Sequence, residues 1–170
     1  MDKNVILAKK YGRAIYEIAA EQNSLEKTEE ELHLIADAIK EHADLKELLF
    51  HPLLAKDVKK DTIKKLFADK VQPVVLQFCY VVIDRDRITD FPAMVDVYTT
   101  LAHHGMGIEE AVVTSALPMT KSQVEALKAK LSEITGKKIL MKQKVDTALI
   151  GGFTVQVGYR RNDGSVGRHL

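Results

Sequence analysis

The hydrophobic period of this chain changes once, near residues 103–107, and that change limits what the chain can fold into. Before it, apolar side chains recur every three or four residues, which is the spacing of amphipathic helices. After it, short segments alternate apolar and polar residues, as half-buried strands do. Gly105 and Gly107 stand at the change and are typical of a hinge. We therefore expect two modules, residues 1–104 and residues 105–170.

The first module is predicted to contain six helices joined by short connections, which favours an antiparallel bundle. The first helix carries an apolar stripe at helical spacing, with charged residues between its members: Leu7, Tyr11, Ala14, Ile15 and Ile18. Ile6, Ala8 and Ala19 widen this apolar stripe. A stripe wider than one narrow face can serve core packing alone, or it can also receive a partner helix in a groove between two bundle helices.

The fifth predicted helix differs from the others in composition. Residues 74–83 are apolar almost throughout, and Gln77 is the one clearly polar side chain among them. A helix without a polar face is usually buried on every side. We therefore expect this helix, which begins near Pro73, to be the central rod of the bundle.

The second module is predicted to be a small α+β unit with the order strand, helix, strand, strand. Residues 111–117, 139–145 and 153–157 have the alternation or β-rich composition of strands. Thr120 and Gln123 have the spacing of a capping box, and Gly136 is well placed to end the helix that the box opens. The whole chain is thus expected to be mainly α, a six-helix bundle followed by this module.

Composition excludes several classes of function. The net charge is +1, which gives no general attraction to nucleic acid or to an anionic membrane. Residues 1–104 hold 15 basic and 18 acidic side chains, a net of −3, and residues 105–170 hold 10 and 6, a net of +4. A single cysteine fits a reducing compartment. No apolar run approaches the roughly 20 residues that cross a bilayer, and we expect a cytosolic protein or one held at a membrane's cytosolic side by a partner.

The residues that could carry chemistry are better explained by structural roles. The six histidines include no His-x-x-x-His pair, and Cys79 has no neighbouring cysteine, so no metal site is expected. Cys79 lies in the apolar fifth helix and is expected to be a buried, unreactive thiol. Gly151 and Gly152 precede a strand and not the helix that a phosphate-binding loop requires, so no nucleotide cofactor is expected.

Two charged segments leave alternatives open. Residues 84–87, Asp-Arg-Asp-Arg, are either an active-site cluster or a solvated helix end, and the second is favoured because exposed ion pairs are common. Lys59, Lys60, Lys64 and Lys65 recur at roughly helical spacing. They keep an alternative function open, a helical RNA-binding or regulatory adaptor, although the acidic neighbours favour a solvated face.

Four motifs stand in order along the chain. The first two are Ala8-Lys9-Lys10-Tyr11-Gly12-Arg13-Ala14-Ile15-Tyr16 and Phe50-His51-Pro52-Leu53-Leu54. The third is Val113-Thr114-Ser115-Ala116-Leu117-Pro118-Met119-Thr120 with the helix after it, and the fourth is the glycine pair with Asp163-Gly164-Ser165-Val166. Together these motifs resemble those of the delta subunit of the bacterial F-type ATP synthase, the family of the mitochondrial oligomycin-sensitivity-conferring protein. Residues 158–163 and 167–168 depart from the family's pattern, and we expect this altered end to weaken contacts with the stalk.

This resemblance implies a non-catalytic stator subunit, which links the catalytic head to the peripheral stalk and resists rotary torque during proton-driven ATP synthesis. It implies that the bundle binds N-terminal helices of the alpha subunits, and that the second module contacts the stalk's b subunits. Membrane association would come only through the complex, at the cytoplasmic face of the cell membrane. No nucleic acid is expected as a partner. The groove for the alpha-subunit helices is assigned to side chains of the first and fifth helices: Tyr11, Ala14, Ile15, Ile18, Val75, Phe78 and Val82.

Overall fold

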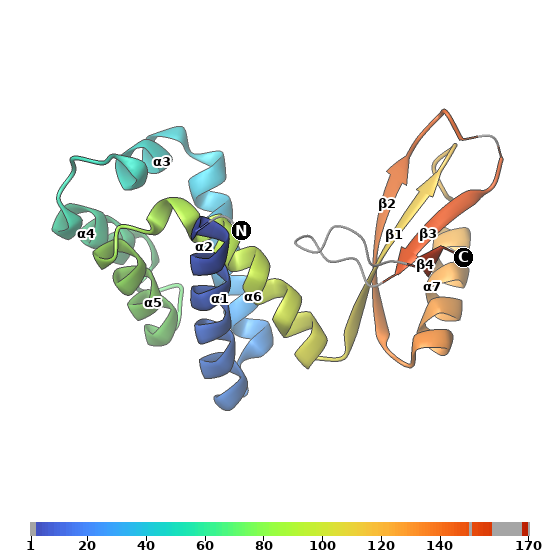
Figure 1. Cartoon of the computed structure of the whole chain (residues 1–170), viewed down its shortest axis with the longest axis horizontal. Coiled ribbons are helices and arrows are strands. Elements are labelled where there is room, and N and C mark those ends of the chain that lie inside the picture. Colours follow the sequence, from blue (N-terminus) through green and yellow to red (C-terminus); the bar gives the residue numbers. More distant parts are fainter. Residues whose placement is uncertain (1–2, 150, 158–167, 170) are drawn as a thin grey trace. The chain divides into compact units, whose positions relative to one another are not determined.

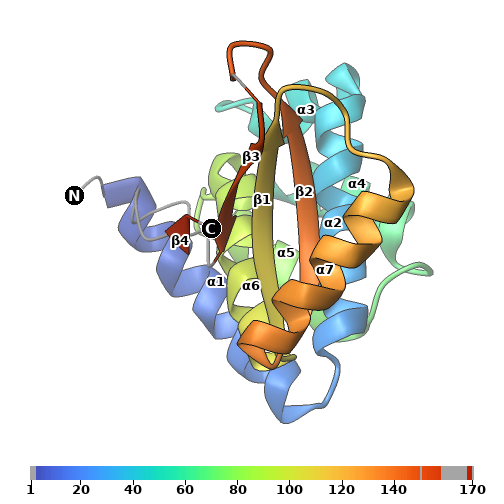
Figure 2. The same cartoon turned by 90° about the vertical axis from the view of Figure 1, so that its right-hand side faces the viewer.

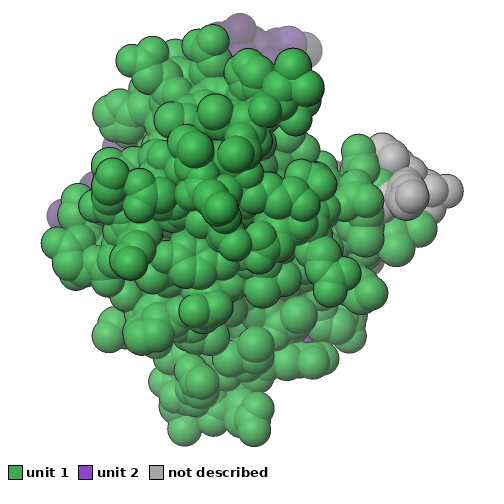
Figure 3. Space-filling model, turned by 90° about the vertical axis from the view of Figure 1, so that its left-hand side faces the viewer, with its two compact units in different colours: residues 1–102 green, residues 103–170 purple. Residues whose placement is uncertain are grey.

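The computed structural model describes residues 3–149, 151–157 and 168–169 (Figure 1). The chain divides into two compact units, residues 1–102, here called the helical unit, and residues 103–170, here called the sheet unit (Figure 3). The prediction of a mainly helical chain with a small sheet is confirmed. The end of the fourth motif, residues 163–166, and the altered residues 158–163 and 167 lie outside the described residues.

Six α-helices and one 3-10 turn precede the sheet. They are α1 (Lys3–Glu21), α2 (Leu25–Glu41), α3 (Ala43–Phe50), α4 (Lys56–Phe67), α5 (Pro73–Asp84), η1 (Ile88–Asp90) and α6 (Phe91–Gly105). Local sequence accounts for several boundaries. Asn23 follows α1 with a positive φ of 54°, a conformation that asparagine tolerates better than most residues. Pro73 opens α5 at a position where its missing N–H costs no helical hydrogen bond.

The core of the helical unit is built from one buried stripe of each helix. On α2, for example, Leu32, Ile35 and Ile39 recur at helical spacing and are all buried. The largest fully buried side chains of this unit include Ile15, Leu32, Ile35, Leu49, Ile63, Ile83, Phe91, Met94 and Tyr98. The Tyr98 hydroxyl is satisfied inside this core because it donates to the Leu25 carbonyl at 2.6 Å.

Helix α1 approaches α6 unusually closely at Gly12. A β-carbon built on Gly12 would lie 2.8 Å from the Met94 carbonyl oxygen and 2.8 Å from the Val97 β-carbon. Both distances are shorter than van der Waals contact, and one partner is backbone, which cannot rotate away. Glycine therefore sets how near the two helix axes can come.

A buried polar cluster fixes the start of α5. The Glu31 carboxylate accepts from the Gln72 backbone N–H at 2.7 Å and from the Gln72 side-chain amide at 3.1 Å. The same amide lies 3.1 Å from the Thr28 hydroxyl. Glu31 and Thr28 are both buried. A carboxylate at this place satisfies a free N–H at the helix N-terminus and opposes the positive end of the helix dipole.

Replacing Glu31 by alanine is expected to destabilise the helical unit. The change leaves the Gln72 backbone N–H without its acceptor in a part-buried place and leaves the Gln72 amide only the Thr28 hydroxyl, a loss of about 1–3 kcal/mol in the free energy of unfolding. Urea unfolding followed by far-UV circular dichroism measures it, with the exposed neighbour Glu30→Ala as the matched control. Equal midpoints for the two variants would show that the carboxylate does not stabilise the start of α5.

The expectation that α5 is buried on every side is wrong. Val75, Cys79, Val82 and Ile83 are buried, but Gln77 and Val81 are exposed. Val74, Leu76, Phe78 and Tyr80 are half-buried. The helix therefore buries one face, and its other face leaves Val81 accessible beside Gln77, which places α5 at the edge of the core and not at its centre.

The sheet unit is a four-stranded sheet with one helix on it. Its elements are β1 (Ile108–Ser115), α7 (Lys121–Thr135), β2 (Lys138–Val145), β3 (Phe153–Val157) and β4 (Arg168–His169). The strand order is β2-β1-β3-β4. Strands β1 and β2 are parallel and are connected through α7, whereas β3 runs antiparallel to β1. The two-residue β4 has no counterpart in the strands expected from the sequence.

Local signals in this unit act as the sequence predicts. The Thr120 hydroxyl accepts from the Gln123 N–H at 3.2 Å, and the Gln123 side chain accepts from the Thr120 N–H at 2.9 Å, which completes the capping box. The core under α7 contains Ala111, Val113, Leu131, Ile139 and Val155. Gly151 and Gly152 have φ near +67° and +68°, so they form a turn before β3, and nothing approaches closely where a β-carbon would be.

Candidate functional site

The predicted groove residues of α1 separate into one buried and three accessible side chains. Ile15 is 1% exposed and belongs to the core. Ala14 and Ile18 are exposed, Ile18 to 40%, and Tyr11 is half-buried. Tyr11, Ala14 and Ile18 follow one another at i, i+3 and i+7, so they form one accessible apolar stripe beside the buried one.

The predicted residues of α5 separate in the same way. Val75 and Val82 are completely buried, so they can shape a groove only from beneath. Phe78 is half-buried and lies in line with Val74 and Val81 at i, i+4 and i+7. Val81 is 44% exposed, the most exposed large apolar side chain of this helix. Val81 is absent from the predicted groove residues because the whole helix was expected to be buried. Its i+3 spacing from Phe78 was the feature that could have identified it.

Both stripes are held by the first turns of α6. On α5, the Phe78 ring lies 6.2 Å from the Phe91 ring, centroid to centroid. On α1, Gly12 packs against Met94, which is one turn further along α6. The two helices that carry the accessible stripes thus pack against the same end of α6.

The arrangement offers apolar contact area and no activated chemistry. Burial raises the pKa of the Cys79 thiol to about 12, which keeps it protonated, and burial also raises the pKa of the Tyr98 phenol. Within the described residues, no three side chains of the metal-binding kinds come together. A nucleophile would need the opposite setting, one that favours its charged form.

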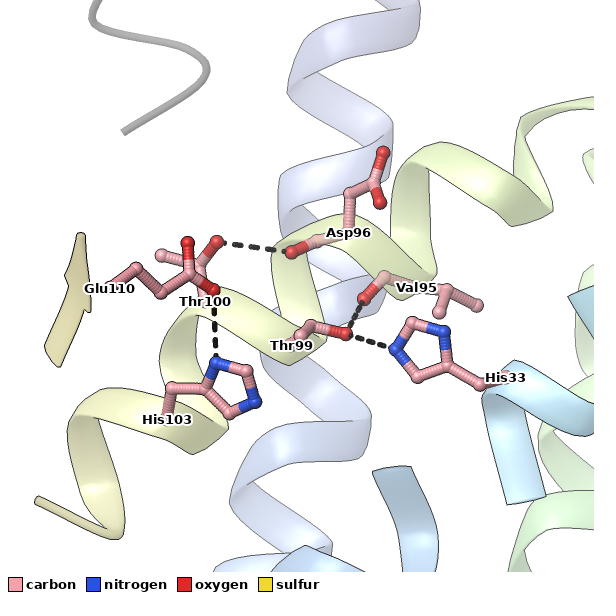
Figure 4. Close-up of polar contacts among 7 residues, drawn as sticks. All are labelled: His33, Val95, Asp96, Thr99, Thr100, His103 and Glu110. Carbon is pink, nitrogen blue, oxygen red and sulfur yellow. Dashed lines mark hydrogen bonds and ion pairs between the residues drawn. The ribbon is translucent and has the colours of Figure 1, made fainter. Parts of the chain in front are cut away.

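Polar side chains near the end of α6 make local structural contacts (Figure 4). The Thr99 hydroxyl donates to the Val95 carbonyl at 2.7 Å and lies 2.9 Å from the His33 ring. Within the sheet unit, His103 Nδ1 lies 3.0 Å from the Glu110 carboxylate. The histidines therefore tie neighbouring elements together in pairs, and the geometry is that of structural contacts.

Cys79 is expected to be unreactive in the folded protein. Its raised pKa means that the thiolate is scarce at pH 8, and its burial blocks access. Treatment with 5,5′-dithiobis(2-nitrobenzoate) should release no chromophore until urea unfolds the chain, after which one equivalent should appear. Since the folded-state pKa is raised, the buried thiol contributes stability that is complete below pH 9 and is lost as pH rises toward 12. Rapid labelling under native conditions would contradict this assignment.

The lysines that suggested an RNA-binding face do not form one. Lys59 is 7% exposed and lies on the same side of α4 as Ile63. Lys60 pairs with Asp84 at 2.8 Å, a contact that raises its pKa, and Lys65 pairs with Asp61 at 2.9 Å. The acidic residues 84 and 86 serve as partners of Lys60 and Lys56 in exposed ion pairs. The residues 84–87 are thus a solvated helix end, and the adaptor alternative loses the feature on which it depended.

The sheet unit has a separate apolar hollow at one end of its core. The hollow measures about 670 Å³ and lies between the start of α7, the loop after β1 and the glycine turn. Leu117 and Phe153, at its lining, are 76% and 47% exposed. Exposed apolar side chains of this size beside a hollow are typical of protein contacts.

Comparisons with known proteins match almost the whole length of this chain. The family model described as ATP synthase delta (OSCP) subunit matches residues 7–170. The protein named ATP synthase subunit delta from Alkaliphilus metalliredigens is 34% identical over 165 residues, covering 97% of this chain and 92% of that protein. The protein of the same name from Alkaliphilus oremlandii is 35% identical over 165 residues, with the same coverage.

A solved structure shares the fold. A chain of the Toxoplasma gondii mitochondrial ATP synthase hexamer superimposes with a TM-score of 0.69 at 18% identity, covering 96% of this chain and 91% of that one. Among the described residues, no helix is both long and apolar enough to span a bilayer. With a family model matching nearly the whole length and relatives above 30% identity, this chain belongs to the ATP synthase delta (OSCP) subunit family.

Proposed function

We propose that this protein is the stator subunit that joins the catalytic head of an F-type ATP synthase to its peripheral stalk. As a member of the delta family it is an accessory subunit and not an enzyme. The observation that carries the proposal is the incomplete burial of α5. The residues of this helix are apolar almost throughout, yet one of its faces remains uncovered. Accessible Val81 and half-buried Phe78 on that face support a contact with a partner.

The helical unit binds N-terminal helices of the alpha subunits. Ala14 and Ile18 of α1, with Phe78 and Val81 of α5, form the accessible apolar contacts, and Tyr11 stands beside them half-buried. Buried Ile15, Val75 and Val82 set the shape beneath. An amphipathic helix presents apolar residues at i, i+3, i+4 and i+7, which is the pattern that such a surface accepts.

The sheet unit contacts the b subunits of the stalk. Its net charge of +4 over residues 105–170, against −3 over residues 1–104, suits it to a different partner from that of the helical unit. Two separate sites on one chain raise the effective concentration of each partner for the other. Resisting torque then requires binding free energy at both sites and no chemical step.

The location follows from the partners. The protein is held at the cytoplasmic face of the cell membrane by its contacts with the other subunits of the complex. No cofactor and no nucleic acid takes part.

Isothermal titration of the full-length protein with a synthetic peptide tests the head contact. The peptide copies the N-terminal residues of the same organism's alpha subunit. We expect saturable heat with about one peptide bound per protein. Absence of binding at high micromolar peptide, with the protein shown to be folded by circular dichroism, would refute the head contact.

A further inference from the structure

The sheet unit has two unlike faces. Strand pairing places Ile139, Met141, Val113 and Val155 on the face that α7 covers. Helix α7 lies against one face of the sheet (Figure 2). Because side chains alternate along a strand, the alternate residues lie on the opposite face. These are Ile108, Glu110, Val112 and Thr114 of β1, Lys138, Leu140, Lys142 and Lys144 of β2, and Thr154 and Gln156 of β3. We call this second surface the lysine face.

The lysine face combines positive charge with an apolar strip. Lys138, Lys142 and Lys144 are all exposed, and none forms an ion pair with a described residue. Leu140 stands among them and is 41% exposed, although a strand face meant only for water would carry a polar residue there. Glu110, its cross-strand neighbour, and Val112, the neighbour of Lys142, are both half-buried.

The acidic groups that face these lysines are few. Glu110 is the one carboxylate among the strand residues described on this face, and its oxygen is 3.0 Å from His103. Glu109 points to the other face, where Lys137 pairs with it at 3.3 Å. The lysine face therefore keeps a net positive charge next to an accessible leucine. A partner surface that complements it carries both acidic and apolar side chains.

The position of β2 limits the shape of that complement. The strand lies at one edge of the sheet, and lysines at an edge oppose the addition of another strand. Edge protection alone does not require an exposed leucine between the lysines. A helix lying across the face, with acidic residues on its flanks and an apolar seam, contacts Leu140 and all three ammonium groups.

We propose that the lysine face binds an acidic amphipathic helix of the peripheral stalk. This inference rests on the proposed function and deepens it, since it assigns the stalk contact to one surface of the sheet unit and states the chemistry of the partner. The carboxylates of the stalk helix pair with Lys138, Lys142 and Lys144, and the apolar side chains of that helix cover Leu140 and Val112.

The test uses the full-length protein and a synthetic peptide that copies the C-terminal helix of the same organism's b subunit. Lys142→Glu combined with Lys144→Glu is expected to weaken binding by at least about tenfold and to reduce its salt dependence. Lys27→Glu combined with Lys121→Glu changes the net charge equally at exposed positions in the first turns of α2 and α7, and should leave the affinity within about twofold. Leu140→Ser should weaken binding and leave the salt dependence unchanged.

The outcomes separate the inference from the proposed function. If the unaltered protein does not bind the peptide, the stalk contact itself is refuted. If it binds and the Lys142→Glu, Lys144→Glu variant binds equally well, the contact is real and lies elsewhere, for example at the hollow beside Phe153. Tighter binding of the lysine face to phosphatidylglycerol vesicles or to an RNA oligonucleotide than to the peptide would also overturn the inference.

Discussion

Replacing Ala14 by aspartate is expected to abolish binding of the alpha-subunit peptide while leaving the fold intact. Ala14 is exposed in the middle of the accessible stripe of α1, so the chain alone tolerates a carboxylate there. In the complex the same carboxylate would be removed from water without a partner. That desolvation costs several kcal/mol, which corresponds to a loss of about a hundredfold or more in affinity.

Ala129→Asp is the matched control for this variant, because Ala129 is an exposed alanine in the middle of α7, in the other unit. It should bind the peptide as the unaltered protein does. Both variants should keep the helical circular dichroism signal and the urea midpoint of the parent. If Ala14→Asp still binds normally by isothermal titration, the accessible stripe of α1 is not the binding surface.

Replacing Gly12 by leucine is expected to destabilise the helical unit severely. A β-carbon at this position already overlaps the Met94 carbonyl and the Val97 side chain at 2.8 Å, and the larger side chain must push α1 and α6 apart. Overpacking of this kind costs about 1–3 kcal/mol or more. The propensity gain of replacing glycine within a helix, about 1 kcal/mol, is too small to offset it.

Urea unfolding at 222 nm measures the effect of Gly12→Leu, and Arg13→Leu at the next, exposed position of α1 is the control. The control should shift the midpoint little. An unchanged midpoint for Gly12→Leu would show that α1 does not approach α6 as closely as the structure places it.

Periodicity predicts the helices and strands because each signal is local. The stripe of α2 and the capping box of Thr120 and Gln123 depend on residues within a few positions of one another, and both are found as expected. Strand β4 was missed because pairing of Gln156 with His169 joins two residues across a segment with no alternation of its own. Such pairing depends on the tertiary fold.

Burial could be predicted only in part. Hydrophobicity identifies α5 as apolar but does not distinguish a core face from a face that awaits a partner, so Val75 and Val81 looked alike. Lys59 was assigned to a solvated face, yet its side chain is buried, since a long aliphatic stem can lie against a core. On α1, the apolar arc contained both Ile15 and Ile18, and only the packing at Gly12 decides which edge of the arc faces α6.

ATP-driven proton pumping tests the stator role most directly. Inverted membrane vesicles are stripped of the catalytic head and of this subunit, and purified head is then added with or without the protein. We expect the head to hydrolyse ATP in both samples, and an acidification signal to appear only when the protein is present, because an unanchored head turns with its rotor. Full acidification without the protein would contradict the account.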